Sequence, residues 1–280
     1  MSEAMENCTH DCSSCQASCA SRSPESLLAP TNEHSRIGRV IAVMSGKGGV
    51  GKSSVTAALA SAMQKRGFRV GVLDGDITGP SIPQAFGIHT RAEGTERGLI
   101  PEYSEEGVAV MSLNLLLNEE TDPVIWRGSI LASAVKQFWT DVVWGDLDYM
   151  FVDMPPGTGD VPLTVLQSLP VDGILVVTSP QDLVTMIVAK AIKMASLMEK
   201  PVLGLIENYS YFVCDACDKK HYIFGESHVD EIAAAHGLPV LAHIPMDPRV
   251  ATAMDTGTVE TMETNHLDPV ADLLAQVPNP

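Results

Sequence analysis

Residues 46–53 read GKGGVGKS and match the pattern G-x-x-x-x-G-K-S, with an additional lysine at the second position. An apolar, β-branched run of strand length precedes them at residues 39–45, and residues 50–66 carry apolar side chains at helical spacing before Gly67. A glycine-rich turn between a strand and a helix lets backbone N–H groups surround phosphate oxygens, and the helix start adds a favourable partial charge. The motif therefore predicts a phosphate-binding loop in an α/β domain.

The loop supplies most of the predicted nucleotide contacts. Lys52 is placed to reach the terminal phosphates, and the Ser53 hydroxyl is placed to ligate Mg²⁺. The expected cofactors are therefore ATP and Mg²⁺. The residues expected to contact the nucleotide here are Gly46, Lys47, Gly48, Gly49, Val50, Gly51, Lys52, Ser53 and Ser54.

Two acidic motifs follow predicted strands. Residues 74–81 read DGDITGPS, and residues 153–160 read DMPPGTGD. A single Asp after a strand is often only a turn former, but in a parallel sheet both motifs would emerge at the carboxyl edge, beside the phosphate loop. Asp153 is then expected to hold Mg²⁺ through water, and Asp76 to complete the metal shell or orient the attacking water.

Strand and helix patterns alternate from residue 37 onward, which predicts a doubly wound, mostly parallel sheet with helices on both faces. Residues 1–36 are expected to form a Cys-rich, loop-like tail, residues 37–280 one P-loop ATPase domain, and residues 77–106 a loop-rich stretch. Besides the strand at 39–45, the expected strands are 69–73, 108–112, 149–152, 173–178, 201–206 and 240–244, and besides the helix at 50–66, the expected helices are 130–139, 182–198 and 267–277.

Composition narrows the function classes. The apolar fraction of 45% is ample for a core, and the formal net charge of −17 argues against nucleic acid as a partner. No apolar run reaches the length of a membrane span, and the polar, Cys-rich beginning of the chain does not read as a signal peptide. The six cysteines lie in clusters, which favours metal or redox chemistry in the reducing cytoplasm over a disulfide framework.

Beyond these motifs the chain resembles a known class of ATPases. The sequence GKGGVGKS with its first lysine resembles the deviant Walker A motif of the MinD-like P-loop ATPases. Residues 74–81 resemble the first switch segment of that class, and residues 153–160 resemble the second. The resemblance supports a MinD-like fold.

Within that class, the late part of the chain is similar to the Mrp/ApbC family of iron–sulfur cluster carriers, in its branch with N-terminal cysteines. The similarity lies in residues 204–217 (GLIENYSYFVCDAC), 223–225 (IFG) and 244–248 (IPMDP). It runs from about residue 38 to about residue 269, with Tyr209 standing where the family usually has Met. The family implies a slow, switch-type ATP hydrolase.

The resemblance also implies roles for individual residues. In a homodimer, Lys47 would reach the partner's nucleotide, so that Lys47, Lys52 and Asp76 form the catalytic set. Asn208 would read the adenine edge, helped by a segment with Pro245 and Asp247. An asparagine amide can donate and accept at one base edge, which suits adenine.

Cys214 and Cys217 form a C-x-x-C pair. One pair cannot complete a four-ligand metal site, but two pairs can meet at the axis of a two-fold dimer. Four thiolates would hold a bridging [4Fe–4S] cluster or a zinc ion, and spacing alone does not separate the two. The family resemblance favours the cluster. A thioredoxin-like redox pair is disfavoured because no strand–CxxC–helix context is present.

The tail offers a second set of thiols, Cys8, Cys12, Cys15 and Cys19. Four thiols so close together can wrap one tetrahedral ion or one cubane cluster, and we rank [4Fe–4S] ahead of zinc and zinc ahead of adventitious thiols. The first gap is shorter than is usual in the family branch with N-terminal cysteines. The resemblance therefore carries over the type of site and not its positions.

The leading hypothesis is a dimeric ATPase that assembles iron–sulfur clusters, accepts them from donors and delivers them to apoproteins. The first alternative is a spatial-positioning ATPase of the MinD or ParA type, but residues 265–277 contain no Lys or Arg for anionic lipid, and the acidic total disfavours DNA. The second alternative is a metal-binding ATPase that uses zinc. An electron-transfer reductase like the nitrogenase iron protein is disfavoured, because its cluster cysteines lie on two separated segments.

Overall fold

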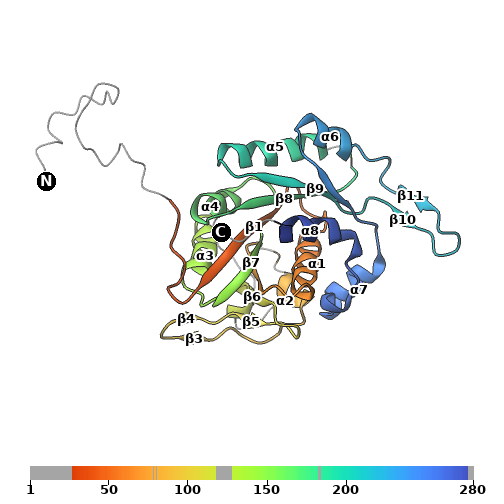
Figure 1. Ribbon diagram of the computed structural model, residues 1–280. Helices are drawn as coiled ribbons and strands as arrows, with labels where there is room; N and C mark the ends of the chain where they lie inside the picture. The colour runs from red at the N-terminus through yellow and green to blue at the C-terminus, as the bar shows by residue number, and fades with distance from the viewer. Residues whose placement is uncertain (1–26, 78, 80, 118–127, 182–183, 277–280) are drawn as a thin grey trace, which may run out of the picture.

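The computed structural model describes residues 27–77, 79, 81–117, 128–181 and 184–276, and the fold is an α/β sandwich (Figure 1). In this described part, eight strands form one sheet in the order β12-β9-β8-β1-β7-β2-β6-β5, parallel except for β5, which pairs antiparallel with β6. In that order the strands span Val240–His243, Val202–Glu207, Gly173–Thr178, Arg36–Ser45, Asp146–Asp153, Val70–Asp74, Ala109–Met111 and Glu102–Tyr103. The predicted doubly wound, mostly parallel sheet is confirmed.

Helices cover both faces of the sheet. One face packs against α3 (Gly128–Thr140), α4 (Asp160–Ser168), α5 (Val184–Leu197) and α6 (Val229–Ala235). The other face packs against α1 (Lys52–Lys65), α2 (Ile82–Ala85) and α8 (Asp268–Gln276), with α7 (Pro248–Thr256) beside α2. Short 3₁₀ turns complete the chain at Leu113–Leu116, Val259–Thr261 and Asn265–Leu267.

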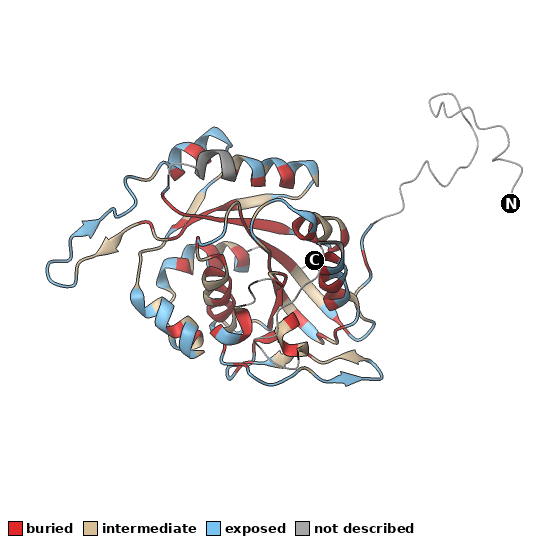
Figure 2. Ribbon diagram, turned by 180° about the vertical axis from the view of Figure 1, so that it is seen from behind, coloured by how far each residue is buried: buried red, intermediate tan, exposed pale blue. Residues whose placement is uncertain are grey.

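Strand β1 shows why this arrangement follows from the sequence. Its central residues alternate between the two cores: Val40 and Ala42 belong to one buried cluster, and Ile41 and Val43 to the other. Successive side chains of a strand point to opposite faces, so a continuous apolar run has a partner on both sides only in a sheet covered twice. Figure 2 shows this central sheet as the most buried part of the molecule.

Two regions are more ordered than the sequence suggests. The stretch expected to be loop-rich contains α2, the hairpin β3–β4 (Gly94–Thr95 and Gly98–Leu99) and the edge strand β5. The region of the C-x-x-C pair contains a second hairpin, β10 (Phe212–Val213) and β11 (Lys220–His221), which projects from the sheet (Figure 1). Strands of two residues carry no detectable alternation, and for this reason the sequence shows only loop there.

The last part of the N-terminal tail packs onto the domain. The Ala29 N–H donates to the Ser168 carbonyl at 2.7 Å, and the Trp139 indole N–H donates to the Ala29 carbonyl at 3.0 Å. Both contacts lie beside α3 and α4, on the opposite side of the molecule from β10 and β11 (Figure 1). The four tail cysteines, Cys8, Cys12, Cys15 and Cys19, lie outside the described residues.

Candidate functional site

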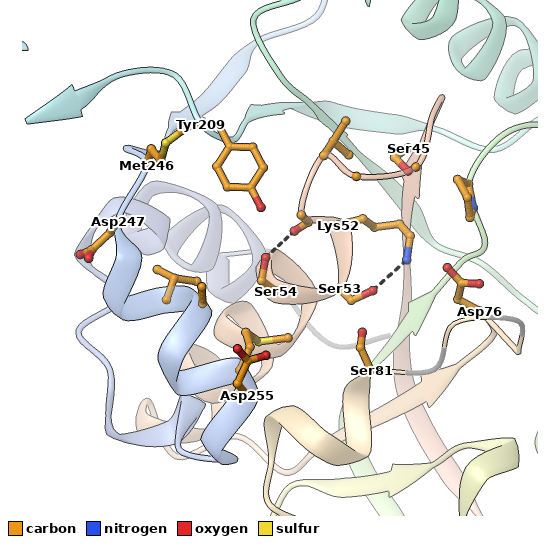
Figure 3. A pocket seen from close by; sticks show the side chains of 18 of the residues that line it. Ser45, Lys52, Ser53, Ser54, Asp76, Ser81, Tyr209, Met246, Asp247 and Asp255 are labelled. Atoms are coloured by element: carbon orange, nitrogen blue, oxygen red, sulfur yellow. Dashed lines mark hydrogen bonds between the residues drawn. The ribbon is translucent and has the colours of Figure 1, made fainter. Parts of the chain in front are cut away.

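The phosphate loop lines a cavity of about 530 Å³ at the carboxyl edge of the sheet. The loop contributes Gly48 to Ser53, the end of β2 contributes Asp76, and the ends of β9 and β12 contribute Tyr209 and Asp247 (Figure 3). The two predicted switch segments, after β2 and β7, therefore meet the loop as expected. Parallel strands present their carboxyl ends at one edge, which is where such sheets bind ligands.

Asp153 accepts hydrogen bonds from three side chains at the buried base of this site, which we call its floor. Its Oδ2 accepts from the Lys52 ammonium at 2.6 Å and from the Ser53 hydroxyl at 2.6 Å, and its Oδ1 accepts from the Thr56 hydroxyl at 2.7 Å. Asp153 is fully buried, so its charge depends on these donors. Lys52 and Ser53 thus both contact Asp153 directly, which brings together three residues that the sequence places in the nucleotide and Mg²⁺ site.

Asp74 is a second buried carboxyl beside the first. Burial, and next the charge of Asp153, raise the pKa of Asp74 to about 8. Its oxygens accept from the Ser112 hydroxyl at 3.0 Å and from the Asp76 N–H at 3.1 Å. The Asp74 side chain therefore holds the turn that carries Asp76, and Asp76 itself lines the cavity.

Gly51 is required by the close approach of β9. Its φ is +74°, and an added Cβ would lie 2.2 Å from the Asn208 amide nitrogen and 2.7 Å from the Tyr209 hydroxyl. The Asn208 amide donates to the Val50 carbonyl at 2.9 Å. The residue after β9 therefore contacts the phosphate loop directly, and only glycine leaves space for this contact.

The predicted adenine-contacting residues share a smaller cavity of about 80 Å³ next to the first. Asn208, Pro245 and Asp247 line it together, and Ser54 and Tyr209 line both cavities. Asp247 also caps α7 by accepting from the Arg249 N–H at 2.8 Å, and hydrogen bonds from the Arg249 side chain lower the pKa of Asp247. The aromatic ring of Tyr209 points toward Ser54 across this region (Figure 3).

Lys47 lies apart from this group. It does not line the main cavity, and its ammonium donates to the Gln181 amide oxygen instead. The structure thus joins Lys52 to the floor of the site and leaves Lys47 on its rim, half-buried. The two lysines of the motif therefore occupy different environments within one chain.

Cys214 and Cys217 lie in the turn between β10 and β11. The Cys214 N–H donates to the Lys219 carbonyl at 3.0 Å, and the Cys217 N–H donates to the Cys214 carbonyl at 3.4 Å. The N–H of Ala216, and next the thiol and N–H of Cys217, lower the pKa of Cys214. Both thiols are free, and Cys217 is exposed. A lowered pKa favours the thiolate, which is the form that binds metal.

Within one copy, the residues that the structure describes supply too few ligands for a closed metal site at this hairpin. Among the described residues, no group of three or more His, Cys, Asp or Glu side chains could hold a metal ion. The C-x-x-C pair therefore offers two thiolates, and the remaining ligands of a four-coordinate centre have to come from another molecule or segment.

Sequence reasoning missed two polar residues that support the floor. Thr56 follows Ser53 by three positions, so helical spacing on α1 places both on the face toward Asp153. Ser112 follows β6 in the way that the two aspartates follow β2 and β7. Both signals are readable in the sequence once the strand order is known.

The comparisons with known proteins agree with this geometry. The ParA family model, described as the NUBPL iron-transfer P-loop NTPase, matches residues 36–278. The chain belongs to this iron-transfer P-loop NTPase family. An iron-sulfur cluster carrier protein of Clostridium perfringens is 43% identical over 250 residues, covering 86% of this chain and 87% of the relative. One of Methanocaldococcus jannaschii is 41% identical over 260 residues, covering 90% of each.

The fold of this family member is also similar to those of solved structures. A nucleotide-binding protein of Archaeoglobus fulgidus in complex with ADP has a TM-score of 0.75 and 41% identity, covering 83% of this chain and 91% of that protein. The cell division ATPase MinD of Pyrococcus furiosus has a TM-score of 0.62 and 20% identity, covering 86% of this chain and 100% of its own, which shows the shared fold alone. In the described part of this family member, no helix is long and apolar enough to cross a membrane.

Proposed function

We propose that the protein is an ATP-dependent iron–sulfur cluster carrier. It binds ATP and Mg²⁺, closes as a homodimer, holds a [4Fe–4S] cluster as cargo between two C-x-x-C pairs, and passes the cluster to apoproteins in the cytoplasm. The observation that carries the proposal is the path of β9: Asn208 at its end contacts the phosphate loop, and the chain then continues directly into the hairpin with Cys214 and Cys217.

The nucleotide part of the proposal follows from the buried floor of the site. Lys52 would contact the terminal phosphates, and the Ser53 hydroxyl and the Asp153 carboxylate are suitable oxygen donors for Mg²⁺, Asp153 through water. Asp76, which lines the same cavity, would complete the metal shell or orient water for attack on the γ-phosphate. Asn208, Pro245 and Asp247 would contact the adenine, since they line the adjoining cavity.

The metal part follows from the incomplete thiol set. Two such pairs related by a two-fold axis would supply four thiolates, the ligand number of a [4Fe–4S] cluster. Lys47 would reach the partner's nucleotide in the closed dimer, where an additional cation stabilises charge that develops during phosphoryl transfer. The tail cysteines would hold a second cluster. The dimer is expected to take clusters from donor proteins, and we propose no role for nucleic acid or membrane.

The experiment is anaerobic purification with iron and acid-labile sulfide analysis. We expect the wild-type chain to carry cluster, and the Cys214→Ala/Cys217→Ala variant to lose about one cluster per dimer while it binds ATP normally. Asp215→Ala serves as a matched control, because it changes the same turn and leaves both thiols. Zinc in place of iron and sulfide in the wild-type protein would support the zinc alternative. Unchanged iron in the double variant would exclude the bridging site.

A further inference from the structure

The end of β9 holds a buried carboxylate that the nucleotide site does not use. Glu207 is 1% exposed, and its Oε2 accepts from the Ser210 hydroxyl and lies 3.2 Å from the His243 Nδ1. Its Oε1 accepts from the Ser227 hydroxyl. A buried carboxylate is costly unless several donors surround it, so this cluster is a built feature of the fold.

The two serines mark the two ends of the cysteine hairpin. The hairpin lies within the segment of residues 211–226. Ser210 immediately precedes this segment, and Ser227 immediately follows it. Residues 215–226 are all exposed, so the segment has few contacts of its own with the domain. Both ends of the hairpin are thus fastened to the same carboxylate of Glu207.

Backbone contacts complete the base of the hairpin. The Ser210 N–H donates to the Ile244 carbonyl at 2.9 Å, and the Met246 N–H donates to the Tyr211 carbonyl at 2.7 Å. The Ser227 hydroxyl also accepts from the Val229 N–H at 3.1 Å, at the start of α6. Because β12 and the start of α6 share the base, the position of the hairpin is set by the sheet edge.

The neighbour of Glu207 points the other way. Asn208 is 4% exposed and donates to the Val50 carbonyl of the phosphate loop. Adjacent residues at the end of one strand therefore contact the nucleotide loop and the base of the hairpin. A displacement of this strand end by nucleotide would move both together.

We propose that Glu207 is a positioning residue that transmits nucleotide occupancy from the phosphate loop to the cysteine pair, through Ser210 and Ser227. The consequence for cargo rests on the proposed carrier function, but the mechanical link does not. The hairpin base opens less often while the carboxylate holds both serines, and the Asn208 contact ties that opening to the loop. The metal-free protein can therefore test the link.

The experiment measures the alkylation rate of Cys214 and Cys217 in the reduced, metal-free full chain, resolved by peptide mass spectrometry so that tail cysteines do not contribute. Rates are taken without nucleotide and with saturating ADP–Mg²⁺, whose binding is verified by calorimetry. We expect ADP–Mg²⁺ to change the wild-type rate. In Ser227→Ala the basal rate of the half-buried Cys214 should rise about fivefold, the factor that corresponds to loss of one hydrogen bond of about 1 kcal/mol, whereas Cys217 is already exposed and should change little.

Conservative and matched variants separate positioning from general damage. Ser227→Thr keeps the hydroxyl and should restore the wild-type rate and its response to ADP–Mg²⁺. Glu207→Gln should abolish the response while ADP affinity stays within about twofold, because Asn208 and the loop are unchanged. Asp230→Asn makes the same chemical change at a carboxylate that lies 3.8 Å from the far nitrogen of His243 and is 73% exposed, and it should have no effect.

The outcomes are distinct. Three results would each overturn the role of Glu207. The Cys214 thiol of Ser227→Ala could be alkylated at the wild-type rate, the alkylation rate of Glu207→Gln could keep its full response to ADP–Mg²⁺, or the wild-type alkylation rate could be the same with and without bound nucleotide. If Glu207→Gln does not fold, the Ser227→Ala and Ser227→Thr pair still decides the question. Failure of the wild-type chain to bind iron and sulfide would refute the carrier function and leave the alkylation result intact.

Discussion

The phosphate loop and the cysteine hairpin are built in opposite ways. Around the loop, Lys52, Ser53 and Thr56 all donate to one buried carboxylate, Asp153. The hairpin has strands of two residues each; its Cys217 is exposed and its Cys214 half-buried. The donors around Asp153 thus come from one chain, whereas the described residues at the hairpin supply only two thiols toward a four-ligand metal site.

This difference suits a carrier. A buried, closed metal site with four ligands from one chain would hold its metal and release it only by unfolding. An exposed pair that depends on a second copy can bind tightly when two chains meet and release when they part. The half of the molecule around the phosphate loop would then control the half with the cysteine hairpin, through the contacts at the end of β9.

Lys52→Ala should produce the largest loss of nucleotide affinity. Loss of the ammonium removes the phosphate contact and leaves Asp153 buried beside two hydroxyl donors only. Truncation of a buried charge partner costs several kcal/mol, so ATP affinity should fall on the order of 100-fold or more. Isothermal titration with ATP–Mg²⁺ measures this. The thiols of the hairpin should remain reactive in the variant, since Lys52 bonds to Asp153 and Ser53 and not to the residues at the base of the hairpin.

Lys47→Ala should separate the two lysines of the loop. Lys47 lies outside the main cavity and contacts Gln181, so ATP affinity should stay within about threefold of the wild-type value. If Lys47 acts on the partner's nucleotide, ATP turnover should fall by about 1000-fold, the lower range for an arginine finger. Turnover and sedimentation with a non-hydrolysable analogue give the two readouts. The exposed lysine Lys193, changed to Ala, is the control. Equal loss of affinity in Lys47→Ala and Lys52→Ala would argue against a role in trans.

The two halves also differ in how far the sequence predicts them. Strand β8 is predicted with its observed bounds, and β1 and α1 are found on either side of the loop. These elements are buried on both sides or on one helical face, so their apolar periodicity is strong. The placement of Asp76 and Asp153 beside the loop follows from the parallel sheet alone.

The rest depends on contacts that no local pattern encodes. The sequence does not predict the helices α2, α4, α6 and α7; α6 is short and lies between Ser227 and Gly237. The start of α7 did carry a signal, an aspartate cap followed by proline at Pro248, which is typical of a helix start. The Glu207 cluster joins serines that are far apart in the chain, and only the fold reveals it.

The pH dependence of the stability difference between the wild type and Asp74→Asn should report on the nucleotide half. The pKa of Asp74 is raised to about 8 in the folded protein, above its ordinary value of 3.8. The native state therefore binds more protons than the unfolded state between these values, and Asp74 contributes stability at low pH that is lost as pH rises toward 8. Asp74→Asn, which cannot ionise, should be more stable than the wild type at pH 8.5 by at least about 1.4 kcal/mol, the value of one pKa unit.

The measurement is urea unfolding of both proteins at pH 5 and pH 8.5. The difference in the free energy of unfolding between the two proteins should be smaller at pH 5. The cost of keeping Asp74 protonated in the folded state grows as the pH rises above its ordinary pKa of 3.8, and pH 5 is close to that value. The Asn side chain keeps an oxygen to accept from the Asp76 N–H, and the Ser112 hydroxyl can turn to accept from its amide. A difference that is the same at both pH values would contradict the shift.

Tyr222→Ser should produce the smallest effect and sharpen the comparison from the hairpin side. Tyr222 is 53% exposed, next to β11, so its truncation should change the free energy of unfolding by less than about 0.5 kcal/mol. Phe151→Ala removes a fully buried side chain of β7 from the core and should cost about 3–5 kcal/mol. Urea unfolding of the metal-free monomer compares the two. If Tyr222→Ser costs as much as Phe151→Ala, the hairpin is an integral part of the folding unit. The half with the cysteine hairpin would then be stabilised by the domain, and its exposure would not by itself permit release of cargo.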